Sequence, residues 1–220
     1  MHTLALIFVL AYAPSIALLW YFYHKDKYEP EPRKYVILTF IYGAINSVVI
    51  AVFLEGLIFQ AIPSTALTIA IVAALIEEPA KAFVVRVPYK AGQMDGIMDG
   101  VVYGAAAGLG FAATENLFYG MGFGAGITFV RALLTPIAHG VWTATVGVGF
   151  GLRAEKRSYS ALPILLLIAI FLHFLWNYAA SMAQQNESFI SIQVLLILLN
   201  IYIVFYLMRR GLKEDKIRFG

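Results

Sequence analysis

Long apolar runs fill most of this chain and constrain its fold more than any other sequence feature. They lie at about residues 3–23, 35–59, 66–87, 97–119, 127–152, 161–183 and 190–208. A bilayer core about 30 Å thick needs roughly 20 apolar residues for each helical crossing. Hydrophobic residues make up 61% of the 220 positions and charged residues only 13%, and a soluble domain of this size would not bury so much apolar surface. The sequence therefore predicts an all-α integral membrane protein with about seven transmembrane helices.

The connections between the runs predict the orientation of these helices. Connections with Lys or Arg alternate along the chain with connections that have none, the first group being 24–34, 88–96, 153–160 and the C-terminal tail, and the second 60–65, 120–126 and 184–189. Because cytoplasmic loops are enriched in Lys and Arg, this alternation places the N-terminus outside and the C-terminus in the cytoplasm. We expect a single polytopic membrane domain over residues 1–220, with a motif-bearing core at about 66–183.

Charge and cysteine content exclude several classes of protein. The formal net charge is +3 and the isoelectric point is near 9.0, but the basic residues lie in the connections that set the topology. We therefore expect the lipid bilayer of the cell membrane as the surroundings and no nucleic-acid partner. The absence of cysteine excludes disulfide bonds, thiolate metal ligands and a cysteine nucleophile.

Ionisable side chains interrupt four of the apolar runs. Such a group in mid-bilayer costs at least about 3 kcal/mol on insertion scales, so it needs a partner, a water-filled cavity or a function. At about 1.5 Å per residue from the ends of their runs, Glu77, His139 and His173 come out near the midplane. Acid and imidazole groups at one depth on three helices predict a site. The polar residues of these runs are Glu77, Glu78, Lys81, Glu115, Asn116, Arg131, His139, His173 and Asn177.

The adjacent residues Glu77 and Glu78 predict a general base. Lys81 follows them at helical spacings of four and three, so one lysine can neutralise one of the two carboxylates. One negative charge is left over. Two carboxylates this close in a low dielectric favour sharing a proton, which suits a group that takes a proton from water and later gives one to an amine. A purely structural charge network is the alternative for these three residues.

The remaining polar residues of the runs each allow a functional and a structural interpretation. His173 and Asn177 are four apart on one helical face, and each can donate a hydrogen bond to a developing oxyanion. A single interhelical hydrogen bond is the structural alternative for either histidine. Glu115 and Arg131 have similar depths, so these two residues can form an ion pair.

Two acids and a stripe of small residues mark the run at 97–119. Asp95 and Asp99 flank its start, where helix capping and the helix dipole favour acidic residues, and any further role for them is left open. Small residues at every fourth position allow a neighbouring helix to approach closely. These are Gly96, Gly100, Gly104 and Gly108.

Four sequence blocks on consecutive runs resemble one protein family. The segment Glu77-Glu78-Pro79-Ala80-Lys81 resembles the EExxK motif of the PrsW family of membrane proteases. Residues 111–119, with the sequence FAATENLFY, resemble that family's second block, and His139-Gly140 and residues 173–177 resemble its two histidine blocks. The blocks occur in order from about residue 75 to 180. PrsW proteins belong with the CAAX-protease and bacteriocin-processing superfamily.

The resemblance implies roles for individual residues. It makes Glu77 the base that activates water and Glu78 its partner. The chain departs from the wider superfamily at Glu115, which stands where an FxxxH motif has its histidine, and His139 is the candidate to replace that imidazole. The implied catalytic residues are Glu77, Glu78, His139, His173 and Asn177, of which the last two form the oxyanion side, and the supporting residues are Lys81, Glu115 and Asn116.

The resemblance also implies an activity and a class of substrate. PrsW-type proteases make the first cut in a membrane-anchored anti-sigma factor, which starts regulated proteolysis in a bacterial envelope-stress response. We therefore expect an intramembrane endopeptidase that hydrolyses a peptide bond of a membrane-anchored protein. Neither the particular substrate nor the oligomeric state follows from the residues.

Zinc is the main alternative to a metal-free site. Glu115, His139 and His173 are the alternative zinc ligands, with a glutamate left as base. No HExxH pair is present, and Lys81 supplies positive charge that competes with a cation, so we favour a site without cofactor. Two other classes of function stay open, a proton-coupled carrier, for which the chain lacks paired repeats, and a catalytically silent scaffold or immunity factor.

Overall fold

Helices make up all the regular secondary structure of residues 2–220, the part of the chain that this computed structural model describes. The segments α2, η1 and α3 run without a break, so that a short π-helical segment lies within one long rod. The predicted all-α fold is confirmed. The bounds are α1 His2–Lys25, α2 Arg33–Tyr42, η1 Gly43–Ser47, α3 Val48–Ile58, α4 Ala66–Lys90, α5 Ile97–Phe123, α6 Ala125–Ala154, α7 Ala161–Met182 and α8 Ser188–Phe219.

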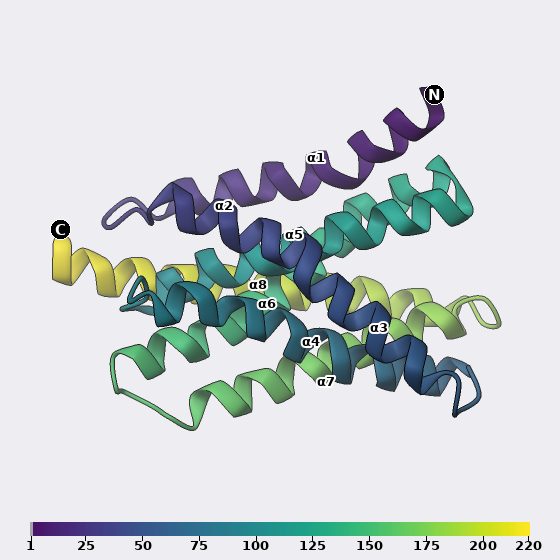
Figure 1. Ribbon diagram of the computed structural model, residues 1–220. Coiled ribbons are helices and arrows are strands. Elements are labelled where there is room, and N and C mark those ends of the chain that lie inside the picture. Colours follow the sequence, from purple (N-terminus) through teal and green to yellow (C-terminus); the bar gives the residue numbers. More distant parts are fainter. Residues whose placement is uncertain (1) are drawn as a thin grey trace.

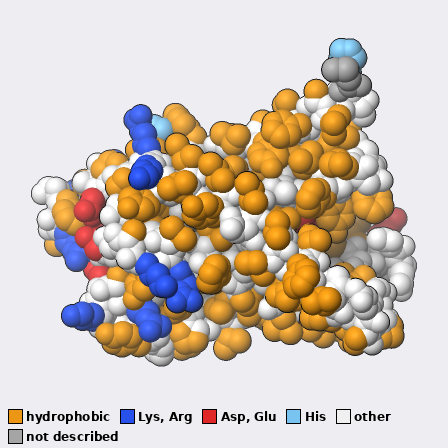
Figure 2. Space-filling view, viewed as in Figure 1, with side chains coloured by type: hydrophobic (Ala, Val, Ile, Leu, Met, Phe, Trp, Pro, Cys, Tyr) orange, Lys and Arg blue, Asp and Glu red, His pale blue; other side chains and the backbone are white. Residues whose placement is uncertain are grey.

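The helices have the length and the surface of membrane-spanning segments. Among residues 2–220, six are long and apolar enough to cross a bilayer, namely α1, the α2–α3 rod, α5, α6, α7 and α8. The helix α4 has 25 residues but carries Glu77, Glu78 and Lys81 within its apolar run. Apolar side chains cover much of the surface (Figure 2), and Phe53 and Leu167 are 63% and 64% exposed. The chain is a multi-pass membrane protein, and its crossing number of about seven stays a prediction.

The connections lie alternately at the two ends of the bundle (Figure 1). The α1–α2, α4–α5 and α6–α7 connections lie at the left end with the C-terminus, and the α3–α4, α5–α6 and α7–α8 connections lie at the right end. Lys and Arg side chains on the face in Figure 2 gather toward the same left end. This is the arrangement expected from the alternating basic connections, while the assignment of that end to the cytoplasm stays a prediction.

The helices α5 and α6 form the buried centre of the bundle. The apolar part of α5 is 94% buried, compared with 17% for α1 and for α8. A Cβ atom at Gly100 or Gly104 would overlap the α6 backbone, so the two helices touch there backbone to backbone. Gly108 lies in the same way against the carbonyl of His139. The predicted close approach of a neighbouring helix is therefore confirmed, and it sets the position of His139 along α5.

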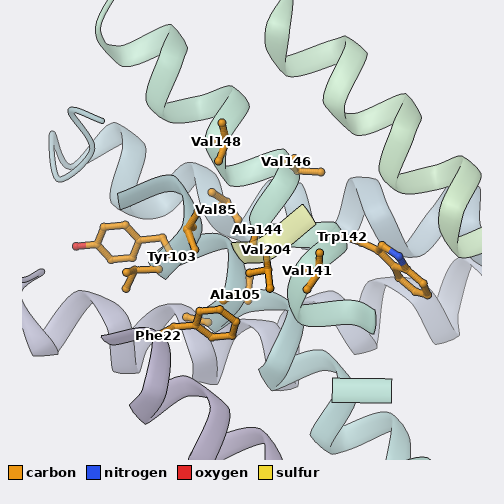
Figure 3. Close-up of a cluster of buried hydrophobic side chains, with 14 of the residues drawn as sticks. Phe22, Val85, Tyr103, Ala105, Val141, Trp142, Ala144, Val146, Val148 and Val204 are labelled. Atoms are coloured by element: carbon orange, nitrogen blue, oxygen red, sulfur yellow. The ribbon is translucent and has the colours of Figure 1, made fainter. Parts of the chain in front are cut away.

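Small and aliphatic side chains fill the space around this centre. In Figure 3, Ala105 of α5 and Val141 and Ala144 of α6 lie close to Phe22 of α1 and Val85 of α4, all of them buried in one cluster. Lipid tails are as apolar as these side chains, so close packing and interhelical hydrogen bonds hold membrane helices together rather than exclusion from water. A well-packed centre therefore positions the polar residues that lie beside it.

Two expected segment boundaries differ from the structure. The connection predicted at 120–126 is almost entirely helical, because α5 ends at Phe123 and α6 begins at Ala125, leaving Gly124 as the turn with φ of 89°. Only glycine adopts this backbone conformation readily. The last helix was expected to end near residue 208, but α8 continues to Phe219. Ion pairs hold this extension, including Arg218 to Glu155 at 2.9 Å.

Candidate active site

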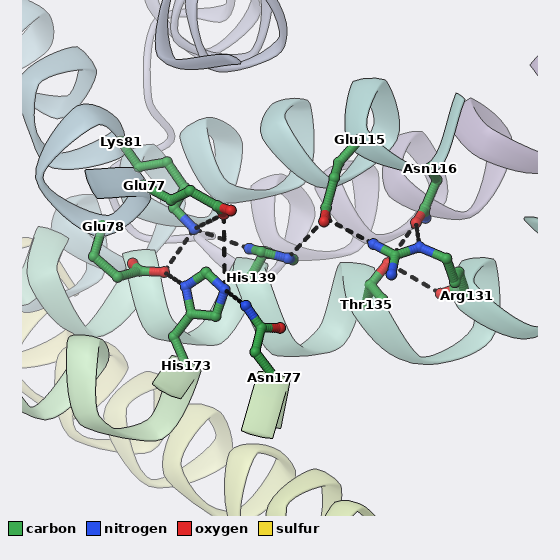
Figure 4. A network of polar contacts seen from close by, with 10 residues as sticks. All are labelled: Glu77, Glu78, Lys81, Glu115, Asn116, Arg131, Thr135, His139, His173 and Asn177. Carbon is green, nitrogen blue, oxygen red and sulfur yellow. Dashed lines mark hydrogen bonds and ion pairs between the residues drawn. The ribbon is translucent and has the colours of Figure 1, made fainter. Parts of the chain in front are cut away.

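Two glutamates and a lysine on α4 form the centre of a buried polar network (Figure 4). The helical spacing brings Lys81 Nζ to 2.6 Å from Glu78 Oε1 and 3.8 Å from Glu77 Oε2. Glu78 and Lys81 have no exposed surface, and Glu77 is 6% exposed. The Lys81 ammonium also lies 4.5 Å from the centre of the Phe111 ring on α5, a cation–π contact. The ion pair that the sequence predicts between this lysine and one carboxylate is present.

His173 on α7 is held by hydrogen bonds at both ring nitrogens. Its Nδ1 lies 2.8 Å from Glu78 Oε1. Because that carboxylate also accepts from the Lys81 ammonium, it is an acceptor, and the Nδ1–H of His173 donates to it. The other nitrogen, Nε2, then accepts from the Asn177 side-chain amide at 3.0 Å. Trp142 stacks on the imidazole with 4.7 Å between ring centres, so the ring is fixed in place and orients Asn177.

His139 on α6 connects the glutamate pair to a second charged group. Its Nδ1 lies 2.9 Å from Lys81 Nζ and therefore accepts, which leaves the proton on Nε2, and Glu115 Oε2 lies 3.1 Å from that nitrogen. Glu115 on α5 also pairs with Arg131 NH2 at 2.8 Å. The predicted pair of Glu115 and Arg131 is confirmed, and His139 links it to the lysine.

The outer part of the network orients the arginine. Arg131 Nε donates to Asn116 Oδ1 at 3.0 Å, and the Thr135 hydroxyl donates to the same oxygen at 2.9 Å. The guanidinium lies 3.7 Å from the centre of the Tyr119 ring. The structure thus brings together all the predicted polar residues of the four runs, and it adds Thr135, which gave no signal because threonine is common in membrane helices.

A pocket of about 510 Å³ opens beside the network and divides its residues into two groups. Five members of the network line the pocket, namely Glu77, Glu115, Arg131, Thr135 and Asn177, whereas Glu78, Lys81, Asn116, His139 and His173 do not. Glu77 Oε2 and Glu78 Oε2 both have no hydrogen-bond partner among the described residues, but only Glu77 lines the pocket. Of the two adjacent carboxylates, Glu77 is therefore the one that a water molecule in the pocket can reach, while Glu78 is tied to Lys81 and His173.

The pocket also contains an acid to which the sequence gave no role. Glu55 of α3 lines it, and its Oε1 is buried without a hydrogen-bond partner among residues 2–220. It is the acid of the apolar run at 35–59 and is thus the same kind of signal as the other intramembrane charges. Glu55 is far in sequence from the motif blocks, so its position beside the other pocket residues could not be predicted.

The donor atoms for a metal ion are close together, but a cation already lies beside them. Oxygen and nitrogen atoms of Glu77, His139 and His173 lie within 4.8 Å of one another, and the alternative ligand Glu115 is not in this group. Two imidazoles and a carboxylate are a common catalytic zinc set. The Lys81 ammonium, however, lies 2.9 Å from His139 Nδ1 and 3.8 Å from Glu77 Oε2. In this arrangement the residues do not fit a zinc ion, because it would lie against that ammonium.

Comparisons with known proteins identify relatives of the chain. A family model described as the PrsW family intramembrane metalloprotease matches residues 31–208. A protein named Protease PrsW from Geobacillus kaustophilus is 35% identical over 175 residues, which cover 76% of each chain. One of the same name from Bacillus subtilis is 33% identical over 76% of this chain and 78% of its own.

A further relative is similar at a lower identity. Protease PrsW from Clostridioides difficile is 28% identical over 190 residues, which cover 78% of each chain. No solved structure matches the chain significantly. The matched region contains α4 to α7, the helices that carry the polar network and most of the pocket walls. From the family match and these relatives, the chain belongs to the PrsW family of intramembrane proteases.

Proposed function

We propose that this chain is an intramembrane endopeptidase in which Glu77 activates the attacking water. The observation that carries the proposal is the division of the glutamate pair, with Glu77 at the pocket and Glu78 tied to Lys81 and His173. Lys81 neutralises Glu78, so the pair retains one negative charge at Glu77. A carboxylate next to a pocket and free of hydrogen bonds is suited to accept a proton from water.

The hydrolysis proceeds by proton transfers through Glu77. Its carboxylate takes a proton from a water molecule as the water oxygen bonds to the carbon of the scissile peptide. The resulting tetrahedral intermediate carries an oxyanion. Glu77 then returns the proton to the leaving amine nitrogen as the carbon–nitrogen bond breaks, so that water is consumed and no acyl-enzyme forms.

Asn177 is the proposed donor to the oxyanion. It lines the pocket, and one N–H of its amide is directed at His173 Nε2, which leaves the second N–H for the substrate. In this arrangement His173 positions the amide rather than donating to the oxyanion itself, a change from the role that the sequence suggested for the histidine. A pre-oriented donor stabilises the developing charge without reorganisation.

The proposed mechanism is metal-free, and His139 has a role suited to it. It accepts from Lys81, and its other ring nitrogen lies 3.1 Å from Glu115, so it holds the lysine beside the glutamates. Zinc bound by Glu77, His139 and His173 is the alternative, and it requires the Lys81 ammonium to move away or lose its proton. A measurement of zinc in active protein separates the two mechanisms.

The proposed substrate is a membrane-anchored protein of the anti-sigma-factor type, cut in the first step of regulated proteolysis. The pocket lies among membrane helices and has apolar walls that include Val48, Val52, Ile69, Ile127 and Leu134. Such walls suit the apolar side chains of a membrane-anchored segment, and the relatives named Protease PrsW support cleavage of a protein.

The proposal is tested with purified Glu77→Gln protein and a single-span substrate that the wild type cuts. Glutamine keeps the volume of the side chain but does not accept a proton from water, so we expect activity to fall about 10²–10⁴-fold. Thermal unfolding checks that the variant is folded. Glu187→Gln, at an exposed position between α7 and α8, is the matched control and keeps full activity. Cleavage by folded Glu77→Gln at close to the wild-type rate would refute the base role.

A further inference from the structure

A second group of buried acids lies far from the proposed active site, at the left end of the bundle in Figure 1. Asp26 and Glu31 belong to the connection between α1 and α2, and Asp99 lies in the first turn of α5. Sixteen residues of the same helix separate Asp99 from Glu115, which is about 24 Å along the axis. The two groups of acids are therefore independent sites.

The three acids lie close together and have no cationic partner. One carboxylate oxygen from each lies within 4.8 Å of the other two, and Asp26, Glu31 and Asp99 are only 3%, 6% and 4% exposed. Within residues 2–220, none of them forms an ion pair with Lys, Arg or His. Arg218, a basic residue at this end, is engaged with Asp95 at 3.3 Å and with Glu155 at 2.9 Å.

The surroundings of two of these carboxyl groups disfavour their ionised form. Burial, followed by the negative charges of Asp99 and Asp215, raises the pKa of Asp26 to about 7. Burial and then Asp99 raise the pKa of Glu31 to about 10. Buried carboxylates become stable when they are protonated, paired with a cationic side chain or bound to a metal ion. The second solution is absent here among the described residues.

Unpartnered polar atoms point to a ligand in this group of acids. Both carboxylate oxygens of Asp26 are buried without a hydrogen-bond partner in the part of the chain that the structure describes. The hydroxyl of Tyr103, one turn after Asp99 on α5, is also fully buried and has no hydrogen-bond partner within 3.5 Å among residues 2–220, and Glu31 and Asp99 are the acids nearest to it. Figure 3 shows this hydroxyl directed away from the labelled apolar side chains.

We infer that Asp26, Glu31 and Asp99, with the Tyr103 hydroxyl, bind a hard divalent cation such as Mg²⁺, Ca²⁺ or Mn²⁺. Every available donor is an oxygen atom, the ligand type that these ions prefer and that zinc and copper do not require. The bound ion compensates the negative charges and joins the α1–α2 connection to the start of α5. It therefore fixes two outer helices against the helix that carries Glu115.

The inference is tested with Mn²⁺ as the probe, using the purified full-length protein in detergent after treatment with a chelator. Electron paramagnetic resonance counts free and bound Mn²⁺, and we expect about one ion bound per chain. The Asp26→Asn and Glu31→Gln double variant should weaken this binding at least about tenfold, because it removes two of the three charged ligands. Glu77→Gln should leave the binding unchanged, which separates this site from the proposed active site.

Tyr103→Phe is a milder variant that removes only the hydroxyl and keeps the ring in the core. We expect it to weaken Mn²⁺ binding severalfold. This variant therefore tests the site even if the double variant does not fold. Glu187→Gln is the control for surface charge and should bind as the wild type does. The inference would be overturned if the wild type bound no Mn²⁺. It would also be overturned if the wild type, the double variant and Tyr103→Phe all bound Mn²⁺ equally. Either result would indicate that the carboxyl groups are kept protonated.

Discussion

Two groups of buried acids, one beside Glu115 and one beside Asp99 of α5, show two ways in which a membrane protein accommodates buried acids. Near the middle of the bundle, Glu78 and Glu115 are each paired with a cationic side chain, Lys81 or Arg131. At the other end of α5, Asp26, Glu31 and Asp99 have no such partner among residues 2–220. The first group is compensated by the chain itself, whereas the second depends on protons or on an added cation.

The difference has a consequence for function. In the mid-membrane group Glu78 lies 2.6 Å from the Lys81 ammonium, whereas Glu77 lies 3.8 Å from it and lines the pocket. Pairing one member of a glutamate pair thus leaves the other available as a base. In the second group no residue is singled out in this way, which suits a binding site rather than a reactive one.

Removal of the internal cation should give the largest effect. Lys81→Met leaves Glu78 buried without its ammonium partner, so we expect a loss of about 3–5 kcal/mol in the free energy of unfolding together with the loss of proteolysis. Thermal or denaturant unfolding in detergent measures the change. Lys90→Met, at the exposed end of α4, is the matched control. An equally small effect of both substitutions would contradict the compensated network.

Removal of the oxyanion donor should reduce activity and leave the fold intact. Asn177→Ala removes the amide that faces the pocket, and we expect kcat to fall about 10²–10³-fold. His173→Ala should cause a loss that overlaps with it, because the histidine orients the same amide, and the double variant should lose less than the product of the two single effects. Multiplicative losses would show that the two residues act separately.

The acids without cationic partners predict a pH dependence of the protein's stability. The folded-state pKa of Asp26 is raised to about 7 from its ordinary value of 3.8, by burial and by the negative charge of Asp99. Between these two values the folded state binds more protons than the unfolded state, so stability falls as the pH rises through this window. Protein treated with a chelator should therefore unfold at a lower temperature at pH 8 than at pH 5. The melting temperature should fall by about 2–4 °C for each kcal/mol lost from the free energy of unfolding.

Addition of Mn²⁺ should reverse most of this loss at pH 8, since the cation replaces the protons. The Asp26→Asn variant should show a weaker pH dependence, because it cannot ionise at this position. A melting temperature that stays constant from pH 5 to 8 in chelated wild type would show that these acids are compensated in another way.

The smallest effect is expected from a zinc-selective chelator. If Lys81 holds the place of a cation beside Glu77, the chelator should leave the rate of cleavage unchanged, and purified active protein should contain no stoichiometric zinc. Elemental analysis of the same sample gives the second measurement. Loss of activity that zinc restores would replace the metal-free mechanism with the zinc alternative.

The residues of the candidate site were largely predictable from the sequence. An ionisable group inside an apolar run of about 20 residues is costly, so each of these residues was visible without a structure. Helical spacing then predicted the contacts within α4 and within α7, such as the one between Glu78 and Lys81. Contacts between helices did not follow in the same way, because depth in the membrane gives only one of three coordinates.

The sequence by itself determined the membrane-embedded all-α fold and the residues in which its polar groups are concentrated, because insertion into lipid depends on local composition. Only the tertiary structure decided which glutamate faces the pocket, that Asn177 takes the place beside it, and that Glu55 lies in the same pocket. It also decided that Asp26 and Glu31 meet Asp99, which lies about 70 residues further along the chain. These relations depend on how the helices rotate and pack around α5, and no local pattern encodes them.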